Sequence, residues 1–252
     1  MTTLATADNP GGAITKAQAG EFEMVGGGKD DLIYPRLHVV QALKSEAEKY
    51  GKLEEGTLVN SVTGEVIASP KDIPALRFVL ITGWIEWIKF KELRGSGIEY
   101  RYLQTNPHAP PKEIPAADLE WTVKANGRKS RAATKFMNFM VLLENDPSPL
   151  ILSYKGTSAN HGRTLNTMQQ LRGNRGRGLF GLSLKDEKND MGSWVSVKPT
   201  SQGDPSPELA DLAKQIAMSL AGKTVVMDVS ADEPGPGDSG GCTDLPEDGI
   251  PI

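Results

Sequence analysis

The segment that most constrains the fold of this 252-residue chain is Ala75 to Lys91, which reads ALRFVLITGWIEWIKFK. β-branched and aromatic residues dominate it, and both kinds of residue favour strands. Gly83 lies in the middle, where a glycine weakens a regular strand and often marks a bulge or bend. The segment therefore predicts one long, irregular strand. It also predicts that Trp84 and Trp87 lie on opposite faces, unless a bulge near Gly83 changes the alternation.

Other strand-like segments follow between turn signals, and few segments have helical periodicity. The expected strands are 57–60 and 65–68 as a hairpin, 97–105, 118–124, 136–144, 150–154, 179–184 with 194–197, and 223–229. The expected helices are a short one at 45–50, one from Thr157 or Ser158 to Leu171, and a capped amphipathic one at 207–220. Eight or nine short strands of this kind favour a mainly β fold, an antiparallel barrel or sandwich, over βαβ repeats.

Composition divides the chain into three parts. Residues 1–30 are rich in Ala, Thr and Gly and have no periodicity, so we expect a flexible N-terminal arm. Residues 31–228 contain all the periodic segments and form the expected folded domain. Residues 229–252 carry six acidic residues and no base, which predicts a disordered acidic C-terminal tail.

The formal net charge of −4 conceals a strong separation of charge along the chain. Between Trp121 and Lys185 there are eleven Lys and Arg residues and only two acids, Glu144 and Asp146. Such asymmetry indicates a polyanionic partner for the folded domain. A solvated charged face is the alternative explanation.

Several classes of protein are disfavoured. No apolar run approaches the ~18 residues of a membrane span, so we expect no membrane association. The single cysteine, Cys242, excludes an internal disulfide and indicates a reducing compartment. The three histidines (His38, His108 and His161) are far apart and form no metal-spaced pair. We therefore expect neither an enzyme nor a bound cofactor or metal.

Aromatic residues alternate with bases at short spacing within the domain. Single-stranded nucleic acid is held in this way, because bases stack on aromatic rings while Lys and Arg contact the phosphates. The same aromatics are also suited to a β core, and that alternative stays open for Trp84, Trp87, Tyr100 and Tyr102. The candidate DNA-binding residues are Trp84, Trp87, Lys89, Lys91, Tyr100, Arg101, Tyr102, Trp121, Lys124, Arg128, Lys129, Arg131, Lys135, Tyr154, Lys155 and Arg163, together with the three arginines described next.

The segment RGNRGRG, residues 172–178, is the sharpest local feature. Its glycines allow the backbone to approach a phosphate, and Arg172, Arg175 and Arg177 are spaced to follow a flexible strand. An ordinary exposed loop is the alternative. We expect a loop that contacts nucleic acid.

The last residues of the chain, DLPEDGIPI, resemble the C-terminal tip of bacterial single-stranded DNA-binding proteins (SSB), a short acidic run followed by Ile-Pro-Phe. Glu247 and Asp248 match the acidic run, and Ile250 and Pro251 match the Ile-Pro. Gly249 interrupts the run, and Ile252 replaces the family's phenylalanine. The resemblance implies that this tip binds replication and repair enzymes.

The body resembles a group of SSB-like proteins from tailed phages. The matching elements are Pro35-Arg36-Leu37, the segment Gly56 to Glu65, and Phe136-Met137-Asn138-Phe139. This resemblance implies an OB-like antiparallel β-barrel with an inserted helix and a C-terminal helix, and a role in phage DNA replication or recombination.

Together these features predict a phage protein that coats single-stranded DNA without sequence preference in the cytoplasm of the host. Its tail would recruit replication and recombination proteins such as a polymerase, helicase or nuclease. A virion structural or assembly protein and a single-strand annealing recombinase are the alternatives. The sequence leaves open whether the protein forms a homo-oligomer.

Overall fold

The computed structural model describes residues 33–91, 97–123, 129–189, 192–221 and 225–229. The predicted arm, almost all of the predicted tail, and Lys124 and Arg128 lie outside these residues. The helices are α1 (Lys44–Tyr50), α2 (Ala116–Leu119), α3 (Ala159–Gln170) and α4 (Pro207–Ser219). The strands are β1 (Ile33–Tyr34), β2 (Leu37–Val39), β3 (Leu58–Asn60), β4 (Val66–Ala68), β5 (Arg77–Phe90), β6 (Ile98–Leu103), β7 (Thr122–Val123), β8 (Lys129–Ser130), β9 (Ala133–Leu143), β10 (Asp146–Lys155), β11 (Leu179–Asn189), β12 (Gly192–Gly203) and β13 (Val226–Met227).

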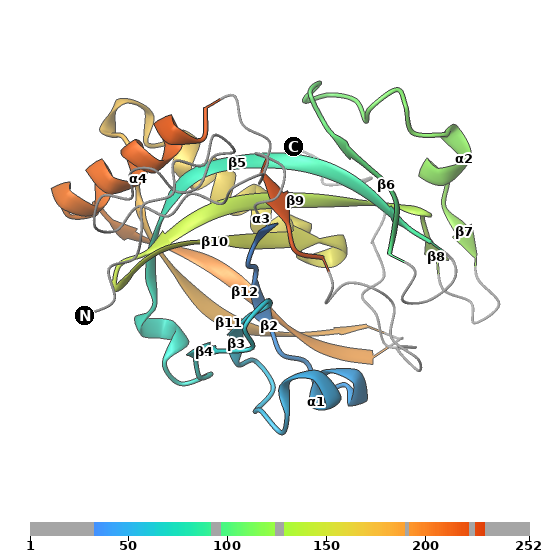
Figure 1. Ribbon diagram of the computed structural model, residues 1–252, viewed down its shortest axis with the longest axis horizontal. Coiled ribbons are helices and arrows are strands. Elements are labelled where there is room, and N and C mark those ends of the chain that lie inside the picture. Colours follow the sequence, from blue (N-terminus) through green and yellow to red (C-terminus); the bar gives the residue numbers. More distant parts are fainter. Residues whose placement is uncertain (1–32, 92–96, 124–128, 190–191, 222–224, 230–252) are drawn as a thin grey trace, which may run out of the picture.

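The predicted mainly β fold with antiparallel sheets is confirmed. The central sheet has six strands in the order β10-β9-β5-β11-β12, and β6 also pairs with β5. All pairs in this sheet are antiparallel. Its outer strands, β10 and β12, do not pair with each other within the described ranges, so the sheet does not close into a barrel there (Figure 1).

β5 is the long irregular strand that the sequence predicts. Its register with β9 shifts between Leu80 and Thr82, so a bulge lies just before Gly83. Beyond the bulge Trp84 pairs with Asn138 and Trp87 with Lys135, which places the two tryptophans on opposite faces as predicted. One edge of β5 follows β9 along most of its length. The other edge pairs with β11 at Arg77–Val79 and with β6 at Glu86–Phe90.

Both faces of the sheet are covered, which explains why the central strands are apolar on both sides. On one face, Leu165 of α3 joins a core with Phe78, Val141 and Phe180. On the other face, Leu209 and Ala213 of α4 pack against Val79, Ile81, Met140 and Leu142. Figure 1 shows α3 and α4 on either side of β5 and β9.

The two long helices form where the sequence predicts them. Ser206 caps α4, because its side-chain oxygen accepts a hydrogen bond from the backbone N–H of Leu209 at 3.2 Å, and Pro207 occupies the first turn. α3 begins after a 3₁₀ turn at Gly156–Ser158. Within the described ranges, no helix has the length and apolar character needed to cross a membrane.

The predicted strand at 118–124 is wrong in its first half. Residues Ala116–Leu119 form the short helix α2, and only Thr122–Val123 is a strand. Pro115 precedes the helix, and the Asp118 side chain turns inward to pair with Lys89, which is 3.2 Å away. This tertiary contact outweighs the weak strand propensity of the segment.

Candidate nucleic-acid interface

The aromatic residues at the β6 end of the sheet form a small core of their own. Trp87 lies opposite Tyr102, and Lys89 lies opposite Tyr100. The rings of Tyr100 and Tyr102 stack with centroids 5.1 Å apart, as expected for residues that share a face. Trp87 is only 5% exposed and its indole N–H donates to Gln104 Oε1 at 2.8 Å. Ile114 and Leu119 cover this cluster, so Trp87 is not accessible for stacking on a base.

Lys89 is neutralised locally by two carboxylates. Its Nζ lies 3.1 Å from Glu99 and 3.2 Å from Asp118, and Asp118 also accepts a hydrogen bond from the Tyr100 hydroxyl at 2.9 Å. The hydrogen bonds to Glu99 and Asp118 raise the pKa of Lys89. Burial and the same Asp118 carboxylate raise the pKa of Tyr100. Lys89 therefore contributes little positive charge to a phosphate-binding surface.

Three other predicted bases lie over aromatic rings at this end and along β9 and β10. The Arg131 guanidinium is 4.6 Å from the centre of the Trp121 ring. Lys135 lies 5.9 Å from the Trp87 ring, and Lys155 lies 5.6 Å from the Phe136 ring. Cation–π contacts of this kind hold the charge in place while leaving it able to face an anion.

Two further predicted bases are Lys91, which follows β5, and Lys129, the first residue of β8. The Lys91 side chain is exposed, and for Lys129 only the backbone is described.

Arg101 is half-buried, and its guanidinium belongs to a polar network with buried partners. Its Nε lies 3.3 Å from Oε2 of Glu86, which is 4% exposed, and its Nη2 donates to the carbonyl of Met227 at 3.0 Å. Asn138 donates to Glu86 Oε1 at 2.5 Å and accepts from the Ser153 hydroxyl at 2.7 Å. These contacts give Arg101 a structural role, and we leave it out of the nucleic-acid interface proposed below.

Tyr154 requires the same correction. It is 1% exposed and packs edge-on against Phe139, with ring centroids 6.2 Å apart. Its position on a fully covered face of β10 leaves no room for a base. Burial raises the pKa of Tyr154.

The hydroxyl of Tyr154 is buried and has no hydrogen-bond partner among the described residues. We expect Tyr154→Phe to leave nucleic-acid binding unchanged and to raise the free energy of unfolding by about 1 kcal/mol, because the variant removes a buried hydroxyl without a partner. Urea denaturation of the variant and of the original chain measures this difference. A loss of stability would show that the hydroxyl does have a partner.

The predicted arginine segment lies beside α3, and its three arginines have different surroundings. Arg172 donates to the carbonyl of Gly203 at 3.0 Å and pairs with Asp204. Arg177 donates to the carbonyls of Leu80 and Ile81 at 2.8 and 3.3 Å, and burial lowers its pKa.

Arg175 lies in a 3₁₀ turn at Gly173–Arg175, and its side chain is exposed. It therefore remains able to contact a phosphate. Arg163, on the exposed side of α3, donates to Asn160 at 3.2 Å.

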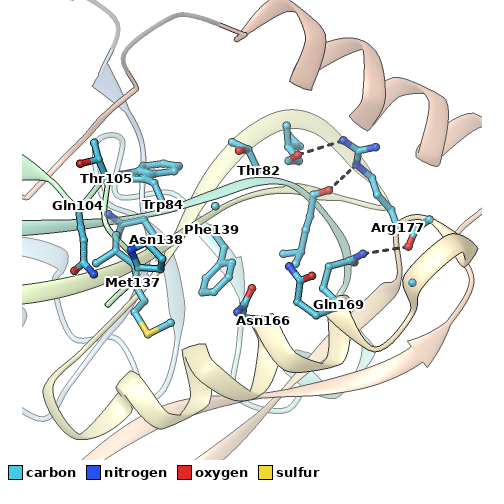
Figure 2. Close-up of a pocket in the computed structure, with 18 residues that line it drawn as sticks. Thr82, Trp84, Gln104, Thr105, Met137, Asn138, Phe139, Asn166, Gln169 and Arg177 are labelled. Atoms are coloured by element: carbon cyan, nitrogen blue, oxygen red, sulfur yellow. Dashed lines mark hydrogen bonds between the residues drawn. The ribbon is translucent and has the colours of Figure 1, made fainter. Parts of the chain in front are cut away.

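A pocket of about 620 Å³ lies between the arginine segment and the end of β6. β5 contributes Thr82, Gly83 and Trp84, β9 contributes Asn138 and Phe139, and the other walls come from α3 and from Arg177 (Figure 2). Five Asn and Gln residues line it, of which Asn138 is fully buried: Gln104, Asn138, Asn166, Gln169 and Gln170. None of the residues that line it is acidic. A pocket of this composition is suited to a neutral polar or anionic ligand.

One comparison with known proteins identifies the family. A model of the Pam3 phage gp34-like protein family matches residues 11–226. The chain belongs to this family. It is therefore a phage protein, as the resemblance of its body to phage proteins implied. No curated protein and no solved structure matches the chain.

The family match contains every residue that lines the pocket, but the sequence prediction did not include most of them. Only Trp84 and Arg177 were among the predicted site residues. Asn166 and Gln170 are four residues apart in the predicted helix, which places them on one face. In the sequence, the signal that could have indicated this site is a pair of uncharged amides four residues apart.

Proposed function

We propose that this phage protein binds single-stranded DNA without sequence preference and coats strands that are exposed during phage DNA replication and recombination. The observation that carries the proposal is the position of the acid-free pocket, between the arginine segment and the aromatic end of the sheet. Trp84 is half-buried and lines the pocket, so part of its ring remains available to stack on a base.

The interface in this proposal is smaller than the set of residues chosen from the sequence. It contains the exposed or half-buried cations Arg163, Arg175, Arg131, Lys135 and Lys155, together with Trp84 and Trp121. The acidic tail, including Glu247, Asp248, Ile250, Pro251 and Ile252, would recruit replication and recombination proteins in the host cytoplasm. Apart from Val229 the tail lies outside the described residues, and this part of the proposal is supported by the sequence of the tip.

The test is a titration of the full chain with labelled oligo-dT at several salt concentrations. We expect binding at low salt that weakens steeply as salt rises, since phosphate contacts release counterions. A lack of binding at low salt, or an equal preference for duplex DNA, would overturn the proposal. Pairing of complementary strands by the protein in the same buffers would instead favour an annealing recombinase.

Arg175 gives a sharper version of this experiment. Its side chain is exposed, and Gly173 and Gly176 on either side of it line the pocket, so Arg175→Ala should weaken oligo-dT binding and reduce the salt slope by about one. Lys214→Ala is the matched control, since Lys214 is exposed on α4, which packs on the other face of the sheet from α3. Equal slopes for the two variants would exclude Arg175 from the interface.

A further inference from the structure

The pocket lies at a gap in the pairing of β5. On this edge of the strand, β11 pairs with Arg77–Val79 and β6 pairs with Glu86–Phe90, which leaves residues 80–85 without a neighbouring strand. Arg177 closes one end of the gap through its hydrogen bonds to the carbonyls of Leu80 and Ile81. At the other end, the backbone N–H of Gln104 donates to the carbonyl of Ile85 at 2.8 Å. Only Thr82 to Trp84 remain open.

Gly83 presents its backbone to this opening. The carbonyl of Ile85 points toward Gln104, and backbone groups in a strand alternate between its two edges. The N–H and C=O of Gly83, two residues earlier, therefore point to the same edge. No other described residue forms a hydrogen bond with them. A glycine at this position also keeps the opening wide, because it places no side chain beside Phe139.

Side chains from α3 and from both faces of the sheet complete the opening. Asn166 and Gln170 are exposed and line the pocket, and their side-chain amides form no hydrogen bond with the part of the chain that the structure describes. Phe139 pairs with Gly83 and Trp84 pairs with Asn138, so the two rings lie on opposite sides of the sheet at the open edge. Figure 2 shows Asn166 pointing from α3 toward Phe139.

The geometry favours a planar heterocycle over an added peptide strand. Three open residues with both ends closed are too few for a typical strand of about five or six residues. The volume of about 620 Å³ lies within the range of about 300–1,000 Å³ typical of small-ligand pockets. Unpaired amide and backbone groups beside aromatic rings match the hydrogen-bonding edge and the flat faces of a base.

We propose that this pocket, which we call the β5-edge pocket, binds a nucleobase. The backbone of Gly83 and the amides of Asn166 and Gln170 form hydrogen bonds with the edge of the base, and Trp84 contacts its face. The base belongs either to a free nucleotide or to a strand of nucleic acid. Only the second source rests on the proposed function.

The first experiment titrates the full chain with deoxynucleoside monophosphates and follows tryptophan fluorescence. We expect quenching that disappears in Trp84→Phe. The double variant Asn166→Ala/Gln170→Ala should weaken binding about tenfold, the effect of losing one or two hydrogen bonds. Gln215→Ala, which removes an exposed amide from α4, should bind like the original chain. Equal quenching by deoxyribose 5-phosphate, or an unaltered affinity of the double variant, would overturn the nucleobase pocket.

The second experiment identifies the source of the base. Oligo-dT and an abasic oligomer of the same length are titrated against the original chain and the double variant. If nucleic acid supplies the base, oligo-dT binds more tightly than the abasic strand, and the double variant loses that difference. Mononucleotide binding without any oligomer binding would support the pocket and overturn the proposed function. If the protein binds the oligomer but no mononucleotide, and the double variant binds the oligomer like the original chain, the proposed function is supported and the nucleobase pocket is overturned.

Discussion

Arg101→Met is expected to lower the free energy of unfolding by about 3–5 kcal/mol, because it removes the cation beside a buried carboxylate. Glu86 is 4% exposed and lies 3.3 Å from Arg101 Nε. Asn138 still donates to Glu86 in the variant, but it carries no charge. Methionine retains much of the apolar volume of the arginine side chain, so the loss in free energy of unfolding comes from the missing charge and not from a cavity. Urea denaturation measures it.

Two further variants make this result interpretable. Lys198→Met changes an exposed lysine on β12 in the same way and should alter stability by no more than about 0.5 kcal/mol. Adding Glu86→Leu to Arg101→Met should recover most of the loss, because no buried charge then remains at that position. If Arg101→Met behaves like Lys198→Met, the ion pair does not stabilise the fold.

Gly162→Leu is expected to destabilise the protein by about 1–3 kcal/mol, the usual cost of forcing extra atoms into a packed core. A Cβ atom at Gly162 would lie 3.1 Å from Cδ2 of Tyr154 and 3.3 Å from Cβ of Met137. The larger side chain must therefore push α3 away from β9 and β10. Since α3 carries Asn166 and Gln170, the displacement should also weaken binding at the β5-edge pocket.

Thermal unfolding followed by circular dichroism measures the change in stability. Thr167→Leu is the matched control, because it adds a leucine to the exposed side of the same helix. A melting temperature of Gly162→Leu equal to that of Thr167→Leu would show that α3 does not pack as closely as the structure indicates.

Local signals in the sequence were sufficient for the elements that depend on local interactions. Ser206 and Pro207 mark the start of α4, and the bulge near Gly83 was expected from a glycine within a strand. The order of the strands could not be predicted in this way. β5 pairs with β9 and β11, and these pairings depend on contacts between residues that are distant in the sequence.

The site was predicted only in part, because residue type does not reveal exposure when both faces of a sheet are covered. Tyr154 and Trp87 alternate with bases just as surface residues would, but each is at most 5% exposed. Arg101 matched a phosphate ligand by type, and its carboxylate partner lies on a neighbouring strand. Asn166 and Gln170 were missed because uncharged amides on a helix rarely indicate a site.

The pairing of β1 with β13 has a consequence for how this chain is made. Ile33 lies beside Val226 and Tyr34 beside Met227, so the first and last strands described are neighbours. Met227 and Val229 also cover Ile88, Phe136 and Ile151. During synthesis on the ribosome this apolar surface stays uncovered until the last strand emerges. A nascent chain that stalls before residue 226 therefore leaves this apolar surface exposed to solvent and becomes a target for host chaperones and proteases.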